Sequence, residues 1–123
     1  ILSESPLEQP ERIETYARLN TYQTELFAWF LDKLASTPDG EGSLLDHSLI
    51  LYGASLSNPN LHAHFDLPLA LAGGSTSRPG AGTHSVQTAD TPMSNLLMTM
   101  LDLAGVALPD AVGDSNGVLD LDL

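Results

Sequence analysis

Four polar residues with a regular spacing of two are the strongest candidates for chemistry in this sequence. They are Asn60, His62, His64 and Asp66. In an extended segment alternate side chains project from one face, and two imidazoles with a carboxylate suit zinc or another divalent ion. His84, which follows a stretch rich in Gly, Ser and Pro, could complete the set. The pattern predicts a divalent-metal site; the alternative is a surface loop whose polar side chains satisfy turns.

Other residues suited to catalysis have simpler structural explanations. His47 precedes an apolar run and is expected to make local hydrogen bonds. Ser55 and Ser57 lie close in sequence to His62, and histidine can activate a serine nucleophile. The chain nevertheless has no Gly-x-Ser-x-Gly elbow. Asp114 stands in a run of turn-forming residues. The sequence therefore assigns no catalytic residue.

Charge and composition make several partner classes unexpected. Four basic residues against 16 acidic ones give a net charge of -12, which repels nucleic-acid phosphates and anionic lipid surfaces. The chain has no cysteine, so it can form neither a disulfide nor a thiolate metal site. Its apolar runs are far shorter than the roughly 20 residues of a membrane helix. We expect no nucleic-acid partner and no membrane span.

The pattern of apolar residues predicts an α/β fold. Helical spacing over residues 13–34 predicts a long amphipathic helix, and residues 90–105 predict a second one. Residues 48–52 and 67–72 are nearly continuous apolar runs, which are typical of strands covered on both faces. Short strands are also expected near residue 84 and in the tail after residue 117. We therefore predict a small, mainly parallel or mixed sheet packed by two amphipathic helices.

Three stretches in a fixed order carry a resemblance to a known family. They cover residues 39–53, 62–74 and 113–115. Their order and spacing resemble the C-terminal third of the bacterial proteins grouped as domain of unknown function 1552. The resemblance implies that residues 1–123 form a single domain, the C-terminal segment of a longer parent protein. Any targeting signal would then lie upstream, so the compartment is left open.

That family is distantly similar to the alkaline phosphatase and sulfatase superfamily, which implies a metal-dependent hydrolase of phosphate or sulfate esters. In the superfamily, the strand that matches residues 48–52 leads into an Asp-His or Asp-Asn pair that binds metal. The matching positions here are Gly53, Ala54 and Ser55, which cannot replace that pair. The resemblance therefore implies a hydrolase fold without a complete active site. The alternative is a non-catalytic binding or assembly module.

The predicted elements leave surfaces that need a cover. Two or three strands with two helices expose sheet edges and apolar helix faces. Tyr22 and Trp29 also fall outside the main apolar face of the long helix. We expect a dimer or higher assembly in which a second copy of the chain covers these surfaces.

Overall fold

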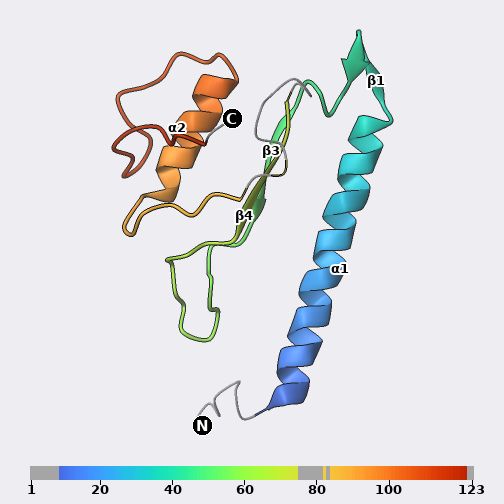
Figure 1. Ribbon diagram of the computed structural model, residues 1–123, viewed down its shortest axis with the longest axis vertical. Helices are drawn as coiled ribbons and strands as arrows, with labels where there is room; N and C mark the ends of the chain where they lie inside the picture. Colours follow the sequence, from blue (N-terminus) through green and yellow to red (C-terminus); the bar gives the residue numbers. More distant parts are fainter. Residues whose placement is uncertain (1–8, 75–81, 83, 122–123) are drawn as a thin grey trace.

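Two helices and two small sheets make up the described part of the chain. The computed structural model describes residues 9–74, 82 and 84–121. The elements in chain order are α1 (Pro10–Ala35), β1 (Pro38–Asp39), β2 (Gly42–Ser43), β3 (Leu49–Gly53), β4 (Leu69–Gly73) and α2 (Met93–Leu103). Figure 1 shows the ribbon of β3 and β4 between the two helices, with α1 on one side and α2 on the other.

Helix α1 contains the whole of the long helix that the apolar spacing over residues 13–34 predicts. Pro10 occupies the first turn, where its missing N–H removes no helical hydrogen bond. The helix ends at Ala35, and the backbone N–H of Ser36 donates to the Asp32 carbonyl at 2.9 Å. No residue of α1 is buried, although the helix is 26 residues long. Within the described ranges, no helix combines the length and the apolar character that crossing a bilayer requires.

The β3 and β4 strands form an antiparallel pair, so the prediction of a mainly parallel or mixed sheet is wrong. Leu49 pairs with Gly73, Leu51 pairs with Leu71, and the last pair is Gly53 with Leu69. The chain between them, residues 54–68, contains no helix that could carry a parallel crossover. Strands β1 and β2 are antiparallel as well. Continuous apolar runs locate strands but do not define their direction.

The predicted cover on both faces of the sheet is also absent from the described residues. Leu49, Ile50, Leu51 and Tyr52 are only half-buried, and three of the five residues of β4 are exposed. The expected strand near His84 is not formed, and residues 118–121 form no strand, while the end of the expected tail strand lies outside the described residues. The small sheet is therefore not fully covered within the described part of the chain.

Helix α1 contacts the β3–β4 hairpin mainly through its C-terminal half. The ring of Phe27 stacks on that of Tyr52, with centroids 4.3 Å apart and planes 8° from parallel. Leu31 and Leu34 lie on the same side of α1 and are half-buried. The backbone N–H of Leu45 donates to the Leu34 carbonyl at 3.4 Å. The aromatic stack thus attaches the helix to the sheet.

Helix α2 holds the C-terminal tail through buried polar side chains. Ser94, Asn95 and Thr99 are 9%, 5% and 6% exposed. The Asn95 amide donates to Asn116 Oδ1 at 2.8 Å, and Asn95 Oδ1 accepts from the Asn116 N–H at 2.9 Å. Thr99 Oγ1 accepts from the Leu119 N–H at 2.7 Å. Because buried polar groups must be paired, these contacts fix where the tail lies on α2.

Candidate functional site

The predicted metal ligands lie in the loop that joins β3 to β4. His62 has φ +50 and Asp66 has φ +51, so the backbone is left-handed at both residues. The segment is therefore not extended. Its alternate side chains do not share the common face that an extended segment would give them. His64 Nδ1 lies 3.1 Å from the Ser55 carbonyl oxygen. The N–H of Asn60 donates to Asn58 Oδ1 at 3.0 Å, which makes a local turn.

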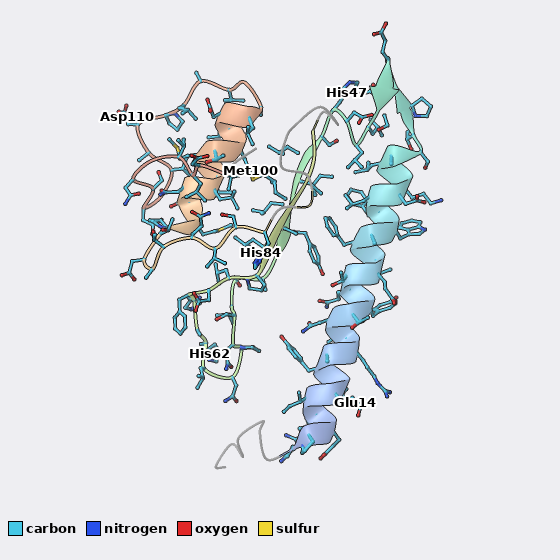
Figure 2. All side chains as sticks on the ribbon, in the orientation of Figure 1. Glu14, His47, His62, His84, Met100 and Asp110 are labelled. Carbon is cyan, nitrogen blue, oxygen red and sulfur yellow. The ribbon has the colours of Figure 1, made fainter. Side chains whose placement is uncertain are left out.

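His84, the fourth predicted ligand, is not brought to the others. Figure 2 shows His62 in the outer part of the loop and His84 well separated from it, close to the strands. In residues 9–74, 82 and 84–121, no three His, Asp or Glu side chains are grouped so that they could hold a metal ion. The metal site formed by His62, His64, Asp66 and His84 stays a prediction from the sequence.

Elemental analysis of the purified chain tests that prediction. A site built on His62 and His64 should hold about one divalent ion per chain, and the His62→Ala/His64→Ala variant should lose it, because two of its nitrogen ligands are gone. Mass spectrometry of the metals after dialysis measures both samples. His47→Ala is the matched control and should keep the metal. Equal metal content in the wild type and the double variant would contradict the site.

The remaining sequence candidates have structural partners. His47 Nδ1 lies 2.8 Å from Asp39 Oδ2, which confirms the expected local bond. Ser57 donates its N–H to the Ala63 carbonyl at 3.0 Å and so closes the β3–β4 loop. Asp114 accepts a short hydrogen bond from the Ser94 hydroxyl. These bonds hold turns and the tail in place, and none of them pairs a serine hydroxyl with an imidazole.

Asp46 shapes the turn that precedes β3. Its Oδ2 accepts the Ser43 hydroxyl at 2.7 Å and the Ser43 N–H at 2.8 Å. These two hydrogen bonds, with a smaller contribution from His47, hold the pKa of the Asp46 carboxyl below its usual value. The carboxylate is therefore ionised at neutral pH and stabilises the turn rather than exchanging protons.

Comparisons with known proteins do not assign the chain to a family. No family model, no curated protein and no solved structure matches it. The resemblance to domain of unknown function 1552 therefore stays a prediction.

The most prominent uncovered feature is a row of large apolar side chains on α1, which we call the outer stripe. Its members, with their exposed fractions, are Leu19 (50%), Tyr22 (57%), Leu26 (48%), Trp29 (60%) and Phe30 (43%). The first four are spaced by three, four and three residues, the a and d spacing of a helix that pairs with another helix. The stripe lies beside the Phe27 face that contacts the hairpin, and not on it.

Sequence reasoning identified only part of this stripe. Apolar periodicity predicts Leu19, Leu26 and Phe30 on the core face of the long helix, with Tyr22 and Trp29 outside it. In the structure, Phe27 provides the contact with the hairpin, and its neighbours on the outer stripe stay exposed. The sequence did contain a signal for the whole stripe. The a and d spacing of a heptad is present at Leu19, Tyr22, Leu26 and Trp29.

Proposed function

We propose that this chain is a non-catalytic assembly module that forms a homo-oligomer, a dimer in the simplest case, through the outer stripe of α1. The observation that carries the proposal is the exposure of five large apolar side chains in one row. Together they leave on the order of 600 Å² of apolar surface in water. Contiguous apolar patches at or above that size on soluble proteins mark interaction sites.

The small apolar core of the described residues supports the same proposal. Only Ala63, Leu96 and Met98 are buried apolar residues in the described part of the chain. Association would provide the apolar burial that the single chain lacks.

One observation favours the alternative hypothesis of a metal-dependent hydrolase. His62 and Asp66 both adopt left-handed backbone in the same loop. Such conformations are uncommon for residues other than glycine, and they cluster at functional sites. A second proposal is therefore that the β3–β4 loop contributes ligands to a metal-dependent site. The metal measurement on the His62→Ala/His64→Ala variant tests this proposal separately from assembly.

Charge reversal on the outer stripe tests the assembly module. Leu26→Glu/Trp29→Glu should weaken association at least about 100-fold, because it removes two apolar contacts and places carboxylates in the interface. Sedimentation velocity at micromolar concentration measures the mass of the wild type and the variant. The net charge of -12 opposes association at long range. The measurement therefore belongs at about 0.15 M salt, where the Debye length is about 8 Å.

A matched control comes from the other side of the same helix. Ala28 is exposed and lies outside the outer stripe. Ala28→Glu should leave the sedimentation coefficient unchanged, and circular dichroism should show α1 intact in all variants. A wild-type chain that sediments as a monomer would overturn the proposal. Equal weakening by Ala28→Glu and by the stripe variant would also overturn it.

A further inference from the structure

We infer that two copies of the chain pair through antiparallel α1 helices, with Leu19 opposite Trp29 and Tyr22 opposite Leu26 of the second copy. This inference rests on the proposed assembly function and adds the orientation and register of the partner. An antiparallel pair with this register has its two-fold axis near residue 24. Residues 13–35 of each helix then lie alongside the other helix, so nearly the whole of α1 is used.

Side-chain size distinguishes the two orientations. In a parallel pair in register, Trp29 meets Trp29 and Leu26 meets Leu26, so wide and narrow layers alternate along the seam. In the antiparallel pair every layer contains one leucine and one aromatic ring. Facing large and small side chains fill the space between two helices most evenly, because the axes stay 8–10 Å apart along their length. The outer stripe therefore favours the antiparallel pair.

Charges beside the seam favour the same orientation. Arg18 precedes Leu19, and Asp32 follows Trp29 by three residues. The antiparallel pair brings Arg18 near Asp32 of the second copy, and symmetry repeats this contact. Glu25 then lies near its own symmetry mate, so one like-charge contact stands against two opposite-charge contacts. Arg18 already pairs with Glu14 at 2.6 Å in an exposed position, where such pairs contribute little, so it can change partner at small cost.

The area involved is sufficient for a specific dimer. If each copy covers the roughly 600 Å² of its outer stripe, the pair buries about 1,200 Å² in total. That value reaches the lower end of the range for specific interfaces, 1,200–2,000 Å². Antiparallel α1 helices also set their macrodipoles in opposition, which a parallel pair does not.

Disulfide cross-linking reads out the orientation directly, because the chain has no native cysteine. We expect an equimolar mixture of the Leu19→Cys and Trp29→Cys chains to form a cross-linked dimer under mild oxidation. Each variant alone should not cross-link, because its two cysteines would lie roughly 15 Å apart along the helix axis, beyond disulfide reach. Tyr22→Cys mixed with Leu26→Cys gives a second, independent pair. Ala28→Cys is the control and should not cross-link in any mixture.

The outcomes separate this inference from the proposed function. Sedimentation of each cysteine variant under reducing conditions first establishes that it still dimerises. If the variants dimerise but Leu19→Cys cross-links with itself, the helices are parallel and the inference is overturned while assembly stands. Dimers that cross-link in none of the mixtures would also overturn it. A monomeric wild type would instead refute the assembly function on which the inference rests.

Discussion

Gly73→Ala is expected to unfold the β3–β4 hairpin. Gly73 has φ +93, and a Cβ added there would lie 2.3 Å from the carbonyl oxygen of Ser48. That contact is with backbone, so no side-chain rotation can relieve it. The next residue, Gly74, donates its N–H to the same oxygen at 2.6 Å, so moving the strand would break this bond too. We expect the free energy of unfolding to fall by at least about 3 kcal/mol.

Gly105→Ala is the control that separates steric overlap from backbone conformation. Gly105 has φ +71, similar to Gly73, but a Cβ there would meet nothing within 4 Å. Its substitution should cost only about 1 kcal/mol for the left-handed backbone. Amide hydrogen exchange of β3 and β4, with thermal unfolding followed by circular dichroism, measures both variants. If the two variants lose equal stability, the close approach of Gly73 to Ser48 is unimportant.

Asn95→Ala should release the C-terminal tail from α2. Asn95 is 5% exposed and makes both side-chain hydrogen bonds to Asn116. Its removal leaves the Asn116 N–H and Oδ1 without their partners, which costs about 2–3 kcal/mol in a buried setting. The local opening of the tail should become correspondingly more frequent. We expect the amide protons of Asn116 and Leu119 to exchange roughly 30-fold faster or more.

The Leu119 amide is the decisive readout, because its acceptor is Thr99 Oγ1 and not the mutated side chain. Faster exchange there shows that the whole tail is released and not only one bond. Asn20→Ala provides the control, since it truncates an exposed asparagine on the other helix. That change should leave both amides as protected as in the wild type. Unchanged exchange at Leu119 in Asn95→Ala would show that the tail is held by other contacts.

The sequence predicts the helices well because their signals are local. Apolar spacing predicts the body of α1 over residues 13–34, which lies within the observed helix. The positions of β3 and β4 are also local signals, and both strands lie within two residues of the predicted runs. The strand expected near residue 84 is not formed, and β1 and β2 are not predicted. Strand direction is not local: it depends on whether residues 54–68 return directly or through a helix. The apolar runs of β3 and β4 read the same in both cases, which is why the sheet was predicted with the wrong direction.

The candidate metal site shows a different limit of prediction from the sequence. A common face for His62 and Asp66 requires extended backbone, and the positive φ at both residues cannot be read from a spacing of two. The polar contacts of α2 were missed because Ser94, Asn95 and Thr99 do not stand out in an amphipathic pattern. A sequence signal for these contacts was present in the tail. The polar run that ends in Asn116 and Gly117 carries donors and acceptors that can pair with the polar side chains of α2.

The attachment of the tail to α2 differs in kind from an apolar contact. Attraction between apolar side chains has no direction, so it does not by itself specify one alignment of two segments. The paired amides of Asn95 and Asn116, and the Thr99 contact with Leu119, match donor to acceptor in one alignment only. A displacement by one residue would lose all of these bonds together. The tail is therefore either seated on α2 or detached from it, with no stable intermediate alignments between the two.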